Sequence, residues 1–256
     1  MQRVLVAGCS FLHIKDLLPF GRLDKINYQK YKIIGDEAAG NLAIAARVRH
    51  EVSKQPYEHV VVLWSGINRI DIEKPKHNSD DGFTTYPYVL DFDDAIWFLS
   101  GGICGSWHSA CPEPVKSEFY SKFLHQTPRL ASDITLSAVV GTQKFLSNRG
   151  IGYTMSFIYD IHRDYNCTLD LFGNRNPRIF AKDRWPQWLA LEHCLGQVDR
   201  TSEWYDKVDW AKFPARQAPF EYCADRNRLR PDRFHPTKDG IRQWFSRQLN
   251  IDLTDY

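Results

Sequence analysis

Three residues near the two ends of the chain have the types that activate a serine nucleophile: Ser10, Asp232 and His235. A serine hydroxyl is a poor nucleophile at neutral pH, so an imidazole must take its proton and later return it to the leaving group. His235 is the candidate base. Asp232 precedes it by three residues, and in a tight turn its carboxylate can hold the second ring nitrogen and fix the tautomer. This spacing predicts acyl transfer through a serine.

The tetrahedral intermediate of such a reaction needs hydrogen-bond donors aimed at its oxyanion. Gly40 and Asn68 follow two further apolar runs of the chain. We expect three donors: the backbone N–H groups of Ser10 and Gly40 and the side-chain amide of Asn68. Arg69, next to the asparagine, is a candidate for binding an acidic group of the substrate or a structural carboxylate.

Short apolar runs rich in β-branched residues predict the buried strands that would position these side chains. The candidate residues follow the carboxyl ends of the predicted strands or precede the last predicted helix. The alternation predicts an α/β fold whose parallel sheet has helices on both faces and binds ligands at its carboxyl edge. The predicted strands are 4–8, 31–35, 59–64 and 152–158, and the predicted helices are 42–52, 130–147 and 238–249, with a further helix beginning after Ser10 over 11–18.

Two aromatic-rich stretches, about 70–125 and 173–230, interrupt this alternation. We expect them to form loops and short elements, including a helix near 187–194, within a single domain over 1–256. Loops at this edge of a sheet form the substrate crevice, so Trp107 is a candidate for substrate binding, although most aromatic residues here fit a small satellite core. His162 is a second candidate; with Asp160 it follows the fourth strand, where the two could instead be a solvated pair.

The blocks around Ser10, Gly40, Asn68 and His235 resemble the SGNH or GDSL hydrolases, a family named for these four residue types. The resemblance covers residues 1 to about 72 and about 225 to 249. The sequence departs from the family pattern at two places. Residues 8–10 are Gly-Cys-Ser, where the family often has Gly-Asp-Ser, and the residues before Gly40 match the family's second block only loosely. It implies a three-layer α/β/α sandwich with a central parallel sheet, flavodoxin-like in outline, and an esterase that uses an acyl-enzyme intermediate without metal or organic cofactor.

The block Trp-Ser-Gly-Ile-Asn-Arg at 64–69 looks like the version in family members associated with surface polysaccharides and phages. This resemblance implies a glycan ester or a small-molecule ester as substrate, and the lack of a long apolar lid or a membrane-binding amphipathic helix favours a short acyl group such as acetyl. Two alternatives remain open. The same triad could transfer the acyl group to a glycan hydroxyl, or the domain could be an idle glycan-binding scaffold in which Ser10 only caps a helix.

Two cysteine-based alternatives also follow from the sequence. Cys104, His108 and Cys111 have zinc-like spacing, but no fourth ligand is evident nearby, so we expect reduced thiols in a loop and no metal site. Cys9 beside Ser10 raises the possibility of a thiol nucleophile. Neighbouring residues of a strand end point in opposite directions, so we expect the Cys9 side chain to lie in the core.

The composition narrows the partners and the compartment. The 33 basic and 31 acidic residues nearly balance, and no long basic block alternates with aromatic residues, so we expect no nucleic acid partner. No apolar stretch approaches the roughly 18 to 20 residues that span a membrane. The six cysteines lack a short-spaced framework, and the first strand begins within a few residues of the amino terminus. These features predict a cytoplasmic protein with reduced thiols and no secretory signal.

Overall fold

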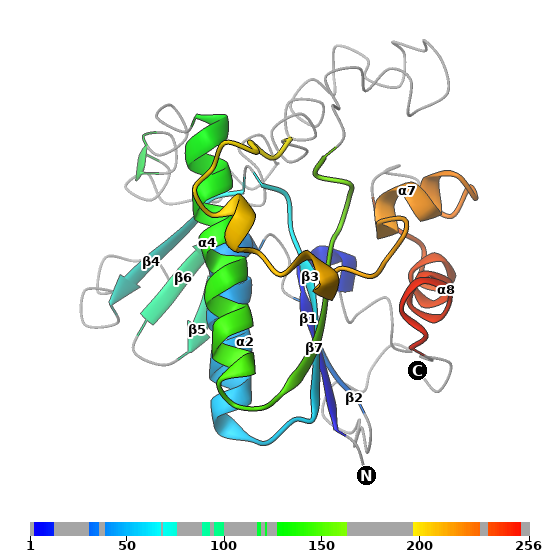
Figure 1. Ribbon diagram of the computed structural model, residues 1–256, viewed down its shortest axis with the longest axis horizontal. Coiled ribbons are helices and arrows are strands. Elements are labelled where there is room, and N and C mark those ends of the chain that lie inside the picture. The colour runs from blue at the N-terminus through cyan, green and yellow to red at the C-terminus, as the bar shows by residue number, and fades with distance from the viewer. Residues whose placement is uncertain are drawn as a thin grey trace.

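A four-stranded parallel sheet forms the centre of the molecule (Figure 1). Its strands are β1 (Val4–Gly8), β2 (Tyr31–Gly35), β3 (His59–Trp64) and β7 (Gly152–Phe157), in the order β2-β1-β3-β7. The sequence predicted a strand at each of these four places, and all four predictions are confirmed. The computed structural model describes residues 3–12, 31–35, 39–67, 69–75, 89–92, 95–99, 117–118, 121, 127–162, 197–230 and 235–251.

The strands pair in a register that brings their carboxyl ends to one edge. Gly8 at the end of β1 lies opposite Gly35 of β2 and Leu63 of β3. Leu63 in turn lies opposite Ser156 of β7. Residues that directly follow these strands therefore emerge side by side, which is where an open α/β sheet binds ligands.

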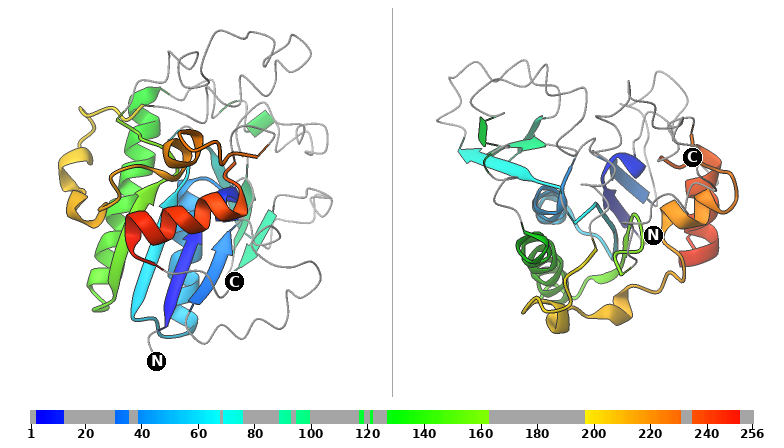
Figure 2. Two further views of the ribbon diagram at one scale, coloured as in Figure 1. Left: turned by 90° about the vertical axis from the view of Figure 1, so that its right-hand side faces the viewer. Right: turned by 90° about the horizontal axis from the view of Figure 1, so that it is seen from above.

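Helices flank this sheet on both sides (Figure 2). The long helices α2 (Asn41–Lys54) and α4 (Pro128–Ser147) pack on each other on one side, and α7 (Pro219–Ala224) and α8 (Lys238–Leu249) lie on the other. Two of them begin with threonine caps: Thr127 accepts from the N–H of Leu130, and Thr237 from that of Gly240, each at 3.1 Å. The helices predicted over 42–52, 130–147 and 238–249 are confirmed to within two residues at each end.

The core is formed mainly by β3 and the helix faces packed on it. Residues 60–64 of β3 are all fully buried, as expected for a parallel strand covered on both faces. Trp64 donates its indole N–H to Met155 Sδ of β7 at 3.4 Å, and Trp244 of α8 donates to the carbonyl of Gln217 at 2.7 Å. The buried indoles therefore keep polar partners while they fill the core.

A second, antiparallel sheet lies within the first aromatic-rich stretch. Its strands β4 (Asp71–Pro75), β5 (Val89–Phe92) and β6 (Ala95–Leu99) are ordered β4-β6-β5. The sequence predicted only loops and short elements here, because these strands are short and β4 carries three charged residues with a single apolar residue between the first two. Trp97 and Leu99 of β6 belong to the main core, and β4 contacts α2, so this sheet packs beside that helix.

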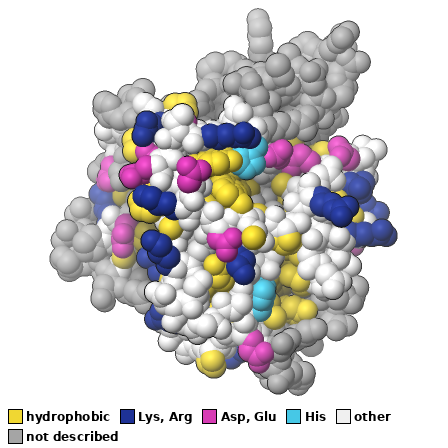
Figure 3. All heavy atoms as spheres, viewed as in Figure 1, with side chains coloured by type: hydrophobic (Ala, Val, Ile, Leu, Met, Phe, Trp, Pro, Cys, Tyr) yellow, Lys and Arg dark blue, Asp and Glu magenta, His cyan; other side chains and the backbone are white. Residues whose placement is uncertain are grey.

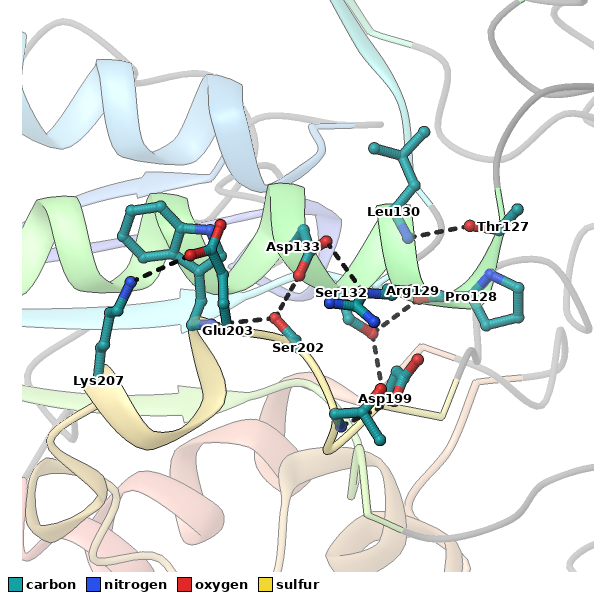
Figure 4. Close-up of polar contacts among 12 residues, drawn as sticks. Thr127, Pro128, Arg129, Leu130, Ser132, Asp133, Asp199, Ser202, Glu203 and Lys207 are labelled. Carbon is teal, nitrogen blue, oxygen red and sulfur yellow. Dashed lines mark hydrogen bonds and ion pairs between the residues drawn. The ribbon is translucent and has the colours of Figure 1, made fainter.

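Polar side chains of α4 hold the segment 197–213, which returns toward α7 (Figure 4). The N–H of Asp199 donates to Ser132 Oγ at 2.8 Å, and the Ser202 hydroxyl donates to the carboxylate of Asp133. Farther along, Gln143 exchanges two hydrogen bonds of 3.0 Å with the backbone of Asp209. These bonds fix a segment that contains only two 3₁₀ turns, η6 (Tyr205–Lys207) and η7 (Trp210–Lys212).

On the face seen in Figure 1, basic and acidic side chains are interspersed over the described surface, with hydrophobic side chains between them (Figure 3). Within the described ranges, no helix combines the length and the apolar character needed to cross a bilayer.

Candidate active site

Ser10 and His235 lie in contact at the carboxyl edge of the sheet. His235 Nε2 and Ser10 Oγ are 2.9 Å apart and joined by a hydrogen bond, although 225 residues separate them in the chain. Both side chains are half-buried. The imidazole ring also packs against Phe11, with 5.5 Å between the ring centroids. The predicted nucleophile and the predicted base therefore lie within the hydrogen-bond distance that proton transfer requires.

Close packing beneath the serine fixes its position. Ser10 starts a 3₁₀ turn, η1 (Ser10–Leu12), in which the N–H of Leu12 donates to the carbonyl of Cys9 at 2.9 Å. A side-chain carbon at Gly8 would lie 2.8 Å from the carbonyl oxygen of Leu63, so only glycine lets β1 end so close to β3. The predicted helix over 11–18 is described only as far as this turn, and the rest of it lies outside the described residues.

The cysteine next to the nucleophile is part of the core. Cys9 is fully buried, so the prediction that its side chain points away from the active-site edge is confirmed. Cys223 of α7 is likewise buried, and burial raises the pKa of its thiol to about 12. A thiol with so high a pKa does not ionise near neutral pH, and the thiolate is the reactive form of cysteine.

A short antiparallel bridge presents His235 to the serine. Leu229 pairs with Pro236, and the N–H of Arg230 donates to the carbonyl of His235 at 2.8 Å. Arg230 Nε also donates to the carbonyl of Pro236 at 3.1 Å. The bridge fixes the residues on both sides of 231–234, the stretch of the chain that contains Asp232. Asp232 itself lies outside the described residues.

Gly40 contacts a carboxylate that the sequence analysis did not single out. Its N–H donates to Asp71 Oδ1 at 2.8 Å, and the N–H of Ala43 donates to Asp71 Oδ2 at 2.9 Å. Gly40 stands at the N-cap of α2 and has no side chain to cap it, so Asp71 at the start of β4 performs this role. A side-chain carbon at Gly40 would lie only 2.7 Å from this carboxylate. The predicted oxyanion donor therefore has an acceptor in this structure, and its catalytic role stays a prediction.

Burial dominates the titration of Asp71. The residue is 6% exposed, and burial raises the pKa of its carboxyl from 3.8 to about 6, although the N–H groups of Ala43 and Gly40 and the charge of Arg69 act in the opposite direction. The sequence could not indicate this residue, because it is 31 positions from Gly40 and its capping role depends on tertiary contact.

Asp71 makes the stability of the protein depend on pH. Because its folded pKa lies above the unfolded value, the folded state keeps a proton that the unfolded chain loses between about pH 4 and 6. Its contribution is complete below pH 4 and is lost as the pH rises through 6. The pKa difference corresponds to about 3 kcal/mol. We expect denaturant titrations to show the Asp71→Asn variant gaining about this much free energy of unfolding, relative to the wild type, between pH 4 and 7.

Glu73→Gln is the control for this measurement, since it removes an exposed carboxylate from the same strand. A wild type that gains stability over Asp71→Asn across this pH range would show that the amide hydrogen bonds outweigh burial. The pKa of Asp71 would then be lowered rather than raised.

Arg69 is directed into the protein. The residue is 6% exposed, and its Nη1 donates to the carbonyl of Ala39 at 3.2 Å. It lies near the buried Asp71 carboxyl, whose pKa its charge lowers. The sequence analysis gave Arg69 two possible partners, an acidic group of the substrate and a structural carboxylate. Asp71 is a structural carboxylate of this kind. Binding of an acidic substrate group stays a prediction.

His162 lies beyond the end of β7, where its ring contacts aromatic residues. The ring centroid is 5.3 Å from that of Trp210 and 5.9 Å from that of Tyr205. Its backbone N–H donates to Asp160 Oδ1 at 3.0 Å, and burial lowers the pKa of its imidazole. The predicted pair of Asp160 and His162 thus forms a local turn, with the imidazole half-buried rather than solvated.

The other predicted site residues lie outside the described residues: Asn68, Trp107 and the possible zinc ligands Cys104, His108 and Cys111, as does the helix predicted near 187–194. Where side chains are described, no group of three metal-ligating residues comes together.

The tertiary structure brings together two of the predicted site residues, Ser10 and His235, in direct hydrogen-bond contact. It adds Asp71, which binds the backbone of a third, Gly40. Comparison of the chain with protein-family models, with curated proteins and with solved structures finds no match to any of them.

Proposed function

We propose that this protein is a serine esterase of the SGNH type. The observation that carries the proposal is the 2.9 Å hydrogen bond between Ser10 Oγ and His235 Nε2 at the carboxyl edge of a parallel sheet. A hydroxyl and an imidazole in this arrangement are the minimal machinery of covalent acyl transfer. The order of Ser10, Gly40, Asn68 and His235 along the chain supports the same assignment, because it resembles the order of the four blocks in this family.

In the first half of the proposed reaction, Ser10 Oγ attacks the ester carbonyl while His235 Nε2 takes its proton. The tetrahedral intermediate then collapses, the carbon–oxygen bond to the alcohol breaks, and His235 returns the proton to the departing oxygen. In the second half, water gives a proton to His235 and attacks the acyl-enzyme. The acid is released and the proton returns to Ser10. The cycle consumes one water and leaves the protein unchanged.

The remaining roles follow the sequence-based assignment. Asp232 would orient His235 and stabilise the imidazolium that forms in each half-reaction. The oxyanion would be bound by the backbone N–H groups of Ser10 and Gly40 and by the Asn68 amide. For Gly40 this requires its N–H to exchange the Asp71 carboxylate for the oxyanion.

We also propose that the fold is the three-layer, flavodoxin-like sandwich that the resemblance implies. The strand order β2-β1-β3-β7 supports it, because flavodoxin-like sheets begin with the second strand, then the first, then the third. The helices on both sides of the sheet support it further (Figure 2). The proposed substrate is a short acyl ester, such as an O-acetyl group, on a carbohydrate.

Labelling with a fluorophosphonate tests the proposed function, because this reagent reacts with serines that a neighbouring base activates. We expect one adduct, mapped to Ser10 by peptide mass spectrometry and lost in Ser10→Ala and in His235→Ala. The same protein should hydrolyse p-nitrophenyl acetate.

Cys9→Ala is the matched control, since the buried thiol next to Ser10 should be dispensable for labelling. A folded wild-type protein that forms no adduct and shows no hydrolysis would contradict the esterase and favour an idle glycan-binding scaffold. An enzyme that forms the acyl intermediate but releases it to a glycan hydroxyl rather than to water would be the acyltransferase.

A further inference from the structure

A buried asparagine joins the start of α2 to the end of β3. Asn41, 2% exposed, accepts from the N–H of Ser65 through Oδ1 at 2.7 Å. Its Nδ2 faces the carbonyls of Ser65 at 3.4 Å and Gly66 at 3.3 Å, and Thr135 Oγ1 at 3.1 Å. One side chain therefore provides partners for the backbone of two successive residues beyond the strand.

Two hydroxyl groups extend this network to the next residue. Thr135 of α4 donates its hydroxyl to the carbonyl of Ile67 at 3.3 Å, and the N–H of Ile67 donates to the hydroxyl of Tyr159 at 3.1 Å. Thr135 is 1% exposed and Tyr159 is fully buried. The segment 65–67 is thus bound by side chains from α2, from α4 and from the residues after β7.

The network is costly to leave incomplete. A buried polar group without a partner destabilises the folded state, so each of these side chains restricts the backbone groups to the positions that its own donors and acceptors allow. The geometry of the segment is consequently set by three separate elements of the fold. A loop exposed to water would have no such restriction.

This segment runs beside the nucleophile. Gly8 and Leu63 are paired in the register of β1 and β3, and Ser10 and Ser65 each follow two residues later. The segment directly precedes Asn68, whose side-chain amide is the proposed donor to the oxyanion. On the other side of that residue, the N–H of Arg69 donates to the carbonyl of Gly66 at 3.3 Å.

We propose that Asn41, Thr135 and Tyr159 are positioning residues of the esterase. Their hydrogen bonds set the position of the 65–67 backbone relative to Ser10. This inference rests on the proposed function. None of the three takes part in proton transfer. They act by holding the backbone that directly precedes Asn68, the proposed oxyanion donor, and a misplacement of about 1 Å at such a donor can lower turnover about 100-fold.

Thr135→Val and Tyr159→Phe test the inference, because each removes one hydroxyl and changes the shape of the side chain little. The chain offers a matched control for each. Thr142→Val removes a buried hydroxyl from the same helix, and among the described residues this hydroxyl bonds to the carbonyl of Ala138. Tyr153→Phe removes a hydroxyl that contacts Ser147. The controls account for the stability that a lost buried hydrogen bond costs.

With p-nitrophenyl acetate as substrate, we expect kcat to fall about 10- to 100-fold in Thr135→Val and Tyr159→Phe, while KM and the midpoint of the pH–rate profile stay at their wild-type values. Thr142→Val and Tyr153→Phe should keep kcat within about twofold. A purely structural role would move stability in all four variants and kcat in none. Hydrogen exchange at 65–67 should accelerate only in the first two.

The outcomes separate the inference from the function. Equal kcat in the test and control variants of an active enzyme would overturn the positioning role alone. A wild-type protein with no Ser10 adduct and no hydrolysis would overturn the esterase, and the positioning role with it.

Discussion

Replacing His235 by alanine should lower kcat for ester hydrolysis by about 10⁴-fold or more, with the fold intact. The structure gives the reason. His235 Nε2 is bonded to Ser10 Oγ at 2.9 Å, and the side chain is half-buried at the sheet edge rather than part of the core. Removing it deprives the hydroxyl of its base and the leaving group of its acid. Steady-state kinetics with p-nitrophenyl acetate, together with circular dichroism, would measure this effect.

His59→Ala is the matched control. This histidine is also half-buried and hydrogen-bonded to a hydroxyl, Thr154 Oγ1 at 3.0 Å, but it lies at the amino end of β3, away from the edge that carries Ser10. Its loss should leave kcat nearly unchanged. The double variant of Ser10→Ala and His235→Ala should be no slower than either single variant, since the two residues act as one unit. Wild-type turnover in either single variant would refute the assignment.

Asp232→Asn should lower kcat by about 10³- to 10⁴-fold. Nε2 of His235 bonds to Ser10 Oγ, and in a triad the orienting carboxylate accepts from the other ring nitrogen, Nδ1. An asparagine at position 232 can offer its amide N–H to that nitrogen and so favour the tautomer with the proton on Nε2, which cannot accept from the serine. The bridge between Leu229 and Pro236 holds the described residues on either side, so we expect the loss to appear in kcat without a change in fold.

Two further carboxylates make this prediction specific. Asp239, exposed in the first turn of α8, lies close in sequence, and Asp239→Asn should keep full activity. Asp160 follows β7 at the carboxyl edge of the sheet. If Asp160→Asn abolished turnover while Asp232→Asn did not, the orienting acid would come from the sheet rather than from the loop before α8.

The regular elements of the parallel sheet could be predicted because their signals are local. Apolar runs such as Val60 to Leu63 mark a strand covered on both faces, and the apolar spacing of 238–249 marks a helix with one buried face. The antiparallel sheet of β4, β5 and β6 has a weaker signal: β6 is an apolar run, but charged residues interrupt both β4 and β5. Its strands have four or five residues each, and although β5 and β6 are near neighbours in the chain, β4 pairs with β6 rather than with β5, which follows it. The short helix α7 was missed for a similar reason.

For the candidate site, residue type and order in the chain were enough to select Ser10 and His235, since few side chains can serve as nucleophile and base. Their contact was decided by the tertiary structure alone: the pairing of β1 with β3 and the bridge before α8 close a separation of 225 residues to 2.9 Å.

The same holds for Asp71 and for the network around Asn41. Their partners lie between 24 and 94 residues away, and a lone aspartate or asparagine carries no local pattern that would reveal a buried role. The order and types of residues were enough to select the candidate chemical groups and the strands of the parallel sheet. The fold then sets which backbone groups are buried and need a side chain as hydrogen-bond partner. The sequence does not reveal these groups, because burial and hydrogen bonding between distant segments exist only after folding.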